Sequence, residues 1–231
     1  PLCSKCGDTG YAGRATCECV KARYAKLLKE QLSSVLPIAD QNFAKFDMSF
    51  YSTRPDGRSG ISPRENMEYN LGECKAYAAK FSKDSPNLLL FGSTGLGKTF
   101  LSTCIAEAVS ARGFSVAYDT AINIVAAYET IKFGSGDGEA AAERAARYER
   151  ADLLIIDDMG TEMGTAFTVS ALYNLINNRL MARRPMIINT NLLPETLSEK
   201  YSPAVASRLL GEFLPLRFFG DDIRLLKMRR T

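Results

Sequence analysis

The sequence predicts an α/β domain in which helices cover both faces of a parallel five-stranded β-sheet. From residue 86 onward, short apolar segments alternate with longer helix-like segments, which is the pattern of a parallel sheet. A glycine-rich loop follows the first apolar segment, and a cysteine-rich segment opens the chain. We therefore expect a cysteine module at 1–20, a helix and linker at 21–64, and the α/β domain at 65–231.

Composition restricts the class of protein. Of the 231 residues, 46% are hydrophobic and 24% are charged, as in ordinary globular proteins. The chain has no apolar run of about 18 residues and no signal-peptide pattern, so we expect a cytoplasmic protein without membrane contact. Histidine is absent, which excludes Ser-His-Asp triads and His metal ligands. Because Pro1 is not an initiator Met, we expect a fragment or a processed chain.

Four of the six cysteines lie within the first nineteen residues. In a reducing compartment, clustered cysteines are typical of metal sites rather than of disulfides. Two closely spaced pairs can each chelate one tetrahedral ion, and structural Zn²⁺ is the favoured interpretation; an Fe–S cluster and free thiols are the alternatives. Since all four ligands come from the protein, we expect a closed, non-catalytic site. The predicted ligands are Cys3, Cys6, Cys17 and Cys19.

The elements can be assigned in chain order. A helix is predicted over 21–36, where Pro37 ends it. Residues 43–64 are interpreted as a linker whose aromatic side chains pack on the next domain. A second helix begins at Pro63, because proline is tolerated at the first helical position. The predicted strands cover 87–91, 115–118, 153–156, 186–188 and 214–218, and further helices are predicted up to 112, around 122–128, at 139–150 and at 167–181.

A phosphate-binding loop is predicted between the first strand and the helix that follows. It fits the pattern G-x-x-x-x-G-K-[ST] completely, in the strand-to-helix context that the motif requires. Its backbone N–H groups surround phosphates, and the following helix directs its positive dipole end at them. Lys98 is expected to reach the β- and γ-phosphates of ATP, and the Thr99 hydroxyl to bind Mg²⁺. The predicted nucleotide-binding residues are Gly92, Ser93, Thr94, Gly95, Leu96, Gly97, Lys98, Thr99 and Phe100.

Acidic and amide side chains follow two later strands. We expect Asp157 to hold Mg²⁺ and Asp158 to orient and deprotonate the attacking water, with Glu162 as the alternative for the second role. The ends of parallel strands share one edge of the sheet. Asn191 or Asn189 is therefore expected near the γ-phosphate or the water, unless these residues merely form a turn.

Two arginines near the end of the chain, Arg208 and Arg224, each have two possible roles. An arginine supplied across a subunit boundary stabilises the transition state of phosphoryl transfer. Most arginines instead form surface ion pairs. The residue pattern alone does not decide between these roles.

With these motifs in order, the chain resembles the bacterial replicative-helicase loaders of the DnaC/DnaI type. These share their ATPase domain with the transposition helper IstB and belong to the AAA+ class. The resemblance covers roughly residues 40–230 and rests on the phosphate-binding loop, 157–162, 189–191 and 207–209. The segment 3–11 also resembles the cysteine-rich start of many loaders from Gram-positive bacteria and phages.

The resemblance implies roles for several residues. Asn191 matches the sensor-1 position, Arg208 the arginine finger that reaches a neighbouring subunit's nucleotide, and Arg224 a sensor-2-like arginine. Residues 122–133 match an extra helix that lies near single-stranded DNA. Many AAA+ proteins have Glu where this chain has Asp158, which implies slow hydrolysis or a share for Glu162. Since seven residues follow Arg224, the resemblance also implies that the helical lid domain is absent.

The function implied is ATP-dependent loading of the replicative helicase onto single-stranded DNA in replication initiation and primosome assembly. ATP would be hydrolysed to ADP and phosphate and would act as an assembly switch. The expected cofactors are ATP, Mg²⁺ and Zn²⁺, and the expected partners are the ring helicase, single-stranded DNA and further copies of the chain at the ATP sites. The alternatives are an IstB-type helper on duplex DNA and a scaffold that binds nucleotide without hydrolysis. A small-molecule kinase also has a phosphate-binding loop, but it would need an acceptor site and a lid, and the sequence shows neither.

Overall fold

The computed structural model describes residues 2–33, 41–57, 59–134 and 136–229. Within these ranges, five strands form one parallel sheet: β3 (Asn87–Phe91), β4 (Val116–Thr120), β5 (Leu153–Met159), β6 (Met186–Thr190) and β7 (Phe213–Arg217). Their order across the sheet is β4-β5-β6-β3-β7. The strand that precedes the glycine-rich loop therefore lies inside the sheet, between β6 and β7.

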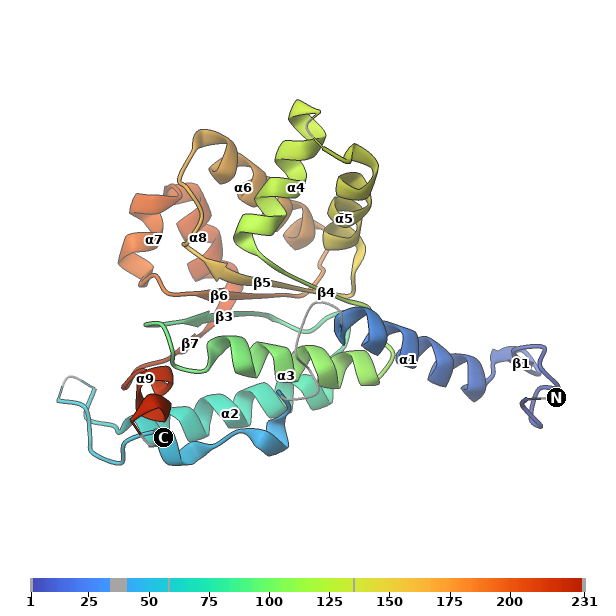
Figure 1. Cartoon of the computed structure of the whole chain (residues 1–231), viewed down its shortest axis with the longest axis horizontal. Helices are drawn as coiled ribbons and strands as arrows, with labels where there is room; N and C mark the ends of the chain where they lie inside the picture. The colour runs from blue at the N-terminus through green and yellow to red at the C-terminus, as the bar shows by residue number, and fades with distance from the viewer. Residues whose placement is uncertain (1, 34–40, 58, 135, 230–231) are drawn as a thin grey trace.

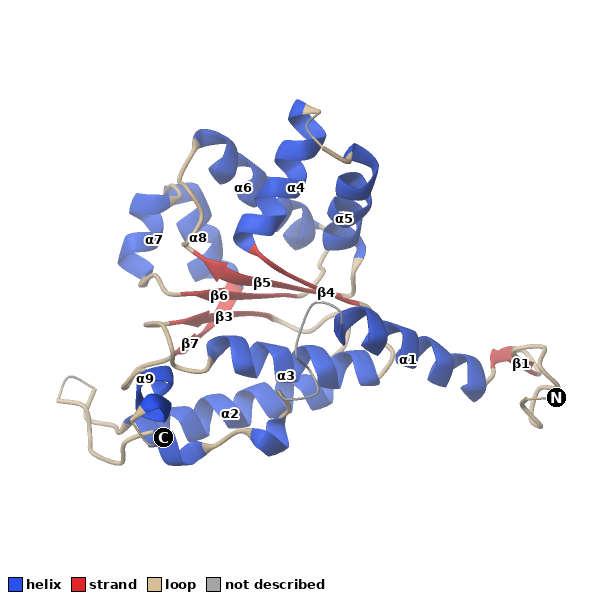
Figure 2. Cartoon of the chain, in the orientation of Figure 1, coloured by secondary structure: helices blue, strands red, loops and turns tan. Residues whose placement is uncertain are grey.

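Helices cover both faces of this sheet, as the sequence predicts (Figures 1 and 2). One face carries α4 (Ala121–Phe133), α5 (Gly138–Arg150), α6 (Ala166–Met181), α7 (Pro194–Lys200) and α8 (Pro203–Glu212). The other face carries α2 (Pro63–Lys80), α3 (Lys98–Ala111) and α9 (Ile223–Met228). None of the helices in the described ranges is long and apolar enough to cross a bilayer.

The N-terminal part consists of a small hairpin and one helix. The hairpin strands, β1 (Tyr11–Ala12) and β2 (Ala15–Thr16), are antiparallel, and α1 (Glu18–Ser33) packs on α3 and β4. Figure 1 shows the hairpin at the outer end of α1, away from the sheet. The predicted boundary after residue 20 falls inside α1, and the predicted helix end, at residue 36 before Pro37, lies outside the described residues.

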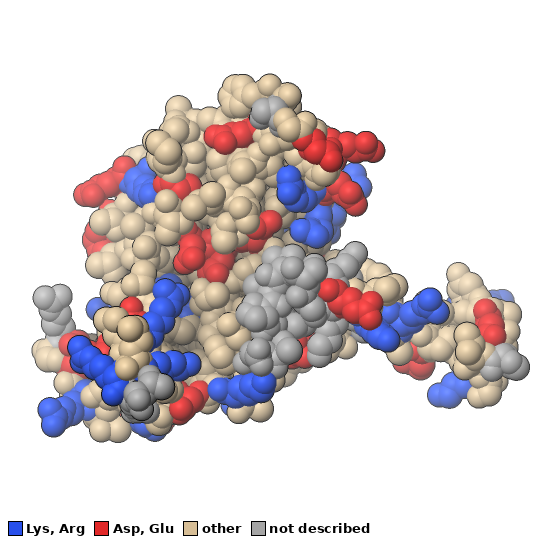
Figure 3. All heavy atoms as spheres, viewed as in Figure 1, with Lys and Arg blue, Asp and Glu red and all other residues tan. Residues whose placement is uncertain are grey.

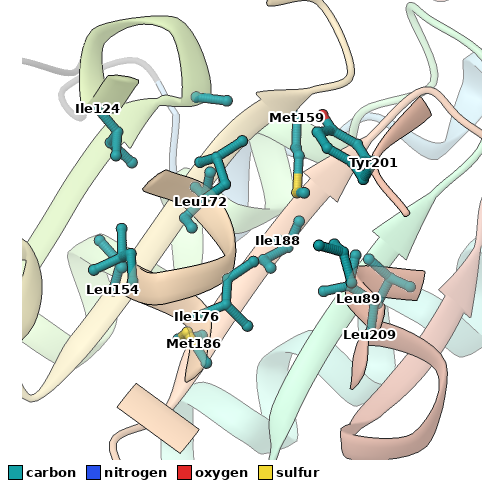
Figure 4. Close-up of a cluster of buried hydrophobic side chains, with 14 of the residues drawn as sticks. Leu89, Ile124, Leu154, Met159, Leu172, Ile176, Met186, Ile188, Tyr201 and Leu209 are labelled. Carbon is teal, nitrogen blue, oxygen red and sulfur yellow. The ribbon is translucent and has the colours of Figure 1, made fainter. Parts of the chain in front are cut away.

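The core is divided between the two faces of the sheet. Successive side chains of a strand point to opposite faces. Thus Leu89 and Ile156 belong to the core on the side of α4 to α8, where Figure 4 shows Leu89 beside Leu209 of α8, while Leu90 and Ile155 belong to the core on the side of α2 and α3. All four side chains are buried completely. This explains the continuous apolar strands in the sequence and confirms that the sheet is covered on both sides.

Several elements differ from the expected ones. The helices α7, α8 and α9 were not predicted; each has at most ten residues, too few for a clear helical period. The strand β5 extends to Met159 because Asp157 still pairs with Thr120 of β4. The register between β5 and β6 then shifts between Ile156 and Met159, so Asp158 lies at an irregular point of the strand.

Candidate functional site

A cavity of about 360 Å³ lies at the carboxyl end of β3. The glycine-rich loop and the start of α3 form its base, and Asp158, Thr161 and Asn191 contribute from the ends of β5 and β6. The remaining walls come from the linker residues 41–51 and from α9. The lining residues of the loop and α3 are Thr94, Gly95, Leu96, Gly97, Lys98, Thr99 and Phe100.

The Lys98 side chain lies inside the curve of the loop. Its ammonium group donates hydrogen bonds to the carbonyl oxygens of Gly92 at 2.6 Å and Ser93 at 2.7 Å. Burial lowers the pKa of Lys98 to about 8, although the negative charges of Asp158 and Asp157 oppose this shift. Lys98 is thus a partly desolvated cation at the position where a loop of this type holds phosphates.

Two glycines allow other segments to approach the loop closely. A Cβ atom at Gly92 would lie 2.0 Å from the carbonyl oxygen of Phe218, and one at Gly95 would lie 2.0 Å from a carboxylate oxygen of Asp222. Both glycines have positive φ angles, +137° and +72°, which side chains disfavour. Backbone conformation therefore favours glycine at both positions, and the Phe218 backbone leaves no room for a side chain at 92.

The Asp157 carboxylate is buried behind the loop and accepts four hydrogen bonds. One oxygen accepts from the Thr99 hydroxyl at 3.1 Å, from the Asn189 amide at 2.7 Å and from the Asp158 backbone N–H at 3.0 Å. The other accepts from the Tyr118 hydroxyl at 2.5 Å. The two predicted Mg²⁺ ligands, Thr99 and Asp157, are thus adjacent. No sequence pattern indicates the supporting role of Tyr118.

The two candidate asparagines at the end of β6 occupy different environments. Asn189 is completely buried and donates to Asp157 and to the Ser102 hydroxyl, so it supports the site from behind. Asn191 lines the cavity, and its side-chain oxygen is buried without a hydrogen-bond partner among the described residues. Of the two, Asn191 is the side chain that a bound molecule can contact.

Asp158 lines the cavity, whereas Glu162 does not. Partial burial, and then the negative charge of Asp157, raise the pKa of Asp158, which makes its carboxylate a better proton acceptor. Glu162 is buried, and its two carboxylate oxygens accept hydrogen bonds from the Tyr201 hydroxyl and, at 3.0 Å, from the Gly160 N–H. The structure therefore brings Asp158 to the cavity and engages Glu162 in the packing beside it.

The two late arginines differ in their surroundings. Arg224 of α9 lines the cavity. In Figure 3, Lys and Arg side chains gather over the part of the surface where Figure 1 places α9. Arg208 of α8 does not line it; its guanidinium group lies 5.3 Å from the centre of the Tyr173 ring and donates to the Tyr173 hydroxyl at 3.1 Å. Of these two arginines, Arg224 is the one that lines the cavity of its own chain.

Residues of the linker form one wall of the cavity, which the sequence did not predict. The Phe46 and Tyr51 rings stack with centroids 5.9 Å apart, and Phe46 also packs edge-on against Phe100 of α3. The aromatic side chains in an otherwise polar segment did predict packing on the domain, but not its location. The linker residues that line the cavity are Gln41, Lys45, Phe46, Asp47, Phe50 and Tyr51.

The four N-terminal cysteines form a compact cluster. The sulfur atoms of Cys3 and Cys17 are 3.8 Å apart, those of Cys6 and Cys19 are 3.5 Å apart, and all four lie within 4.8 Å of one another. Zn–S bonds of about 2.3 Å in a tetrahedron require sulfur–sulfur distances of about 3.8 Å. The donor set and the spacing therefore fit a tetrahedral thiolate site for Zn²⁺.

Comparison with known proteins supports the nucleotide site. Residues 73–212 match the family described as "IstB-like ATP binding protein". The chain is 25% identical over 185 residues to the replicative helicase loader DnaC of Escherichia coli K12, covering 74% of this chain and 75% of that protein. It is 27% identical over 129 residues to a protein named as ATP-binding in an insertion sequence of Mycobacterium tuberculosis, covering 55% and 50%.

A crystal structure of the DnaC helicase loader is similar in fold, with a TM-score of 0.62 and 16% identity, over 79% of this chain and 99% of that one. This similarity confirms the predicted AAA+ type of P-loop fold. The family match spans more than half of the 231 residues and includes the phosphate-binding loop, Asp157, Asp158 and Arg208. The chain therefore belongs to the family of IstB-like ATP-binding proteins.

Proposed function

We propose that this chain is an ATPase that loads a replicative ring helicase onto single-stranded DNA. The similarity to the helicase loader DnaC over three quarters of both chains supports this proposal. The observation that carries it is the arrangement of the charged side chains around the cavity. The chain supplies a cavity with Lys98, Asp158 and Arg224, while Arg208 lies outside it.

The cavity residues can carry out ATP hydrolysis. Lys98 and the loop N–H groups bind the phosphates, while Thr99 and Asp157 hold Mg²⁺, which when bound neutralises charge on the β- and γ-phosphate oxygens. Asp158 deprotonates the attacking water, and Asn191 orients that water or the γ-phosphate. The raised pKa of Asp158 supports its role as the base.

Arg208 provides the assembly switch. Because it contacts Tyr173 and does not line the cavity of its own chain, we infer that it acts on the nucleotide of a neighbouring copy, where it stabilises charge on the γ-phosphate. ATP in the cavity then favours association of subunits, and hydrolysis weakens it. The stacking of Arg208 on Tyr173 supports this role, because it orders the side chain before a neighbour binds.

An IstB-type transposition helper that binds duplex DNA remains the second candidate, since both the family match and the insertion-sequence relative favour it. The cysteine module favours the loader instead, because a small closed module at the start of α1 is suited to docking on a protein.

Exposed apolar side chains of α4, Ile122 and Phe133, are available to contact single-stranded DNA.

Binding to the ring helicase of the same host tests the proposed function. With the helicase immobilised, we expect the chain to be retained with ATP and released without nucleotide. The Lys98→Ala variant, which loses the cation on the phosphates, should be retained poorly in both conditions. Retention by duplex DNA, with no binding to the helicase in any nucleotide state, would support the transposition helper instead.

Replacement of the proposed base should separate ATP binding from turnover. We expect Asp158→Asn to bind ATP as the parent does but to hydrolyse it about 10²-fold more slowly, because proton transfer to the carboxylate is lost. Asparagine tolerates the positive φ of this position, +51°, so the backbone should be unchanged. Glu162→Gln is the matched control. A parental rate in Asp158→Asn, with a slow Glu162→Gln, would transfer the role to Glu162.

A mixing experiment tests whether Arg208 acts on a neighbouring subunit. Arg208→Ala should bind ATP normally and lose about 10³-fold in hydrolysis, measured with the DNA and helicase that assembly requires. Adding Lys98→Ala subunits, which keep Arg208 but lack a working cavity, should restore part of the activity. An arginine that acts within its own chain predicts no rescue at any ratio, and a surface arginine predicts no defect.

The cysteine cluster should contain one Zn²⁺ per chain by elemental analysis. Zn–thiolate bonding supplies the folding free energy of so small a module. Removal of the metal by a chelator should therefore unfold residues 1–20, as seen by amide hydrogen exchange, while ATP binding by the α/β domain stays unchanged. Iron in place of zinc, or a metal-free module with unchanged protection, would contradict this assignment.

A further inference from the structure

Two consecutive peptide groups of the phosphate-binding loop are held by residues from two distant segments, the linker before α2 and the start of α9. The carbonyl oxygen of Gly95 accepts a hydrogen bond from the backbone N–H of Ile223 at 3.0 Å. The carbonyl oxygen of Leu96 accepts one from the Tyr51 hydroxyl, also at 3.0 Å. Both donors lie outside residues 73–212, the part that matches the family. The matched region therefore does not contain the donors to these two peptide groups.

These contacts bear on phosphate binding because a peptide group is planar and trans. Its C=O and N–H point in opposite directions, so fixing one fixes the other. The bond to Gly95 sets the direction of the Leu96 N–H, and the bond to Leu96 sets that of the Gly97 N–H. In loops of this type, such N–H groups surround the phosphates. Gly95 and Gly97 have φ angles of +72° and +94°, and glycine provides little steric restraint of its own.

We propose that Tyr51 is a positioning residue for nucleotide phosphates, and that the N–H of Ile223 has the same role on the preceding peptide. Tyr51 fixes the Leu96–Gly97 peptide so that the Gly97 N–H is directed to the phosphate site. The inference rests on nucleotide binding in this cavity and is independent of helicase loading.

The surroundings of Tyr51 suit this role. Its side chain is 4% exposed and is held by stacking on Phe46. A Cβ atom at Gly97 would lie 2.8 Å from its hydroxyl, so glycine at 97 is what permits the contact with the loop. Burial raises the pKa of Tyr51, so the phenol stays protonated and remains a donor at neutral pH. On the other side, Asp222 packs against Gly95 and caps the helix that provides Ile223.

Removal of the Tyr51 hydroxyl is the first test. Tyr51→Phe keeps the ring and its stacking, so only the hydrogen bond to Leu96 is lost. We expect the Kd for ATP to rise about tenfold, the size that one buried hydrogen bond supports. Inorganic triphosphate should lose affinity by the same factor, because the effect concerns phosphates. Tyr77→Phe is the matched control: its buried hydroxyl has no partner among the described residues, and its removal should leave both affinities unchanged.

Removal of the Ile223 N–H is the second test. Ile223 is the first residue of α9, where proline is well tolerated, so Ile223→Pro deletes the donor and keeps the helix. Ile223→Val shortens the side chain but keeps the N–H and serves as its control. We expect weaker binding of ATP and inorganic triphosphate with proline only. In nucleotide-free protein, the NMR amide signal of Gly97 should move in Tyr51→Phe, and that of Leu96 in Ile223→Pro.

The outcomes separate this inference from simpler explanations. Parental affinity in Tyr51→Phe would overturn it. A loss for ATP with none for inorganic triphosphate would also overturn it, because the hydroxyl would then contact the nucleoside. If Tyr51→Phe weakened binding only by destabilising the fold, its denaturation midpoint would fall and the Gly97 amide signal would stay in place. That result would also overturn the inference. Failure of the parental chain to bind ATP would instead overturn the assignment of the whole cavity.

Discussion

The buried carboxylate of Asp157 connects the elements that form the nucleotide edge of the sheet. Its oxygens accept hydrogen bonds from α3 through Thr99, from β4 through Tyr118 and from β6 through Asn189. A buried charge without such donors would strongly destabilise the fold, so these side chains have to converge on it. The start of α3 is thereby fixed against the strand ends. This arrangement positions three side chains at the cavity, those of Lys98, Asp158 and Asn191.

Much of this arrangement follows from local sequence patterns. The β3 strand has the predicted bounds, Asn87–Phe91, because an apolar strand must precede a loop that binds phosphates between a sheet and a helix. The parallel sheet follows from the alternation of strands and helices. Since parallel strands end at one edge, the sequence alone is enough to group Asp157, Asp158 and Asn191 with the loop. Such features depend on spacing within a few residues or on topology.

Other parts of the site depend on contacts that spacing does not encode. Tyr51 and Leu96 are 45 positions apart, and nothing in the linker indicates which surface its aromatic side chains cover. Asp158 and Glu162 are both acids near the end of β5, yet Glu162 is engaged by Tyr201 and by the Gly160 N–H and does not line the cavity. Likewise, the sequence around Arg208 does not indicate whether its side chain acts on the nucleotide of its own chain or on that of a neighbouring subunit. The helices α7, α8 and α9 were missed because each is short.

The backbone at Asp158 restricts which amino acids can occupy this position during evolution. Its φ angle of +51° lies in the left-handed region, where Asp, Asn and Gly are tolerated much better than longer side chains. Of these three, only Asp has a carboxylate. Many AAA+ proteins have Glu here, but in this chain a change to Glu would gain reach only by adding backbone strain. Replacement of Asp by Glu at position 158 therefore requires a second change that relaxes the irregular end of β5. We expect Asp to persist here among relatives whose β5 has the same irregularity.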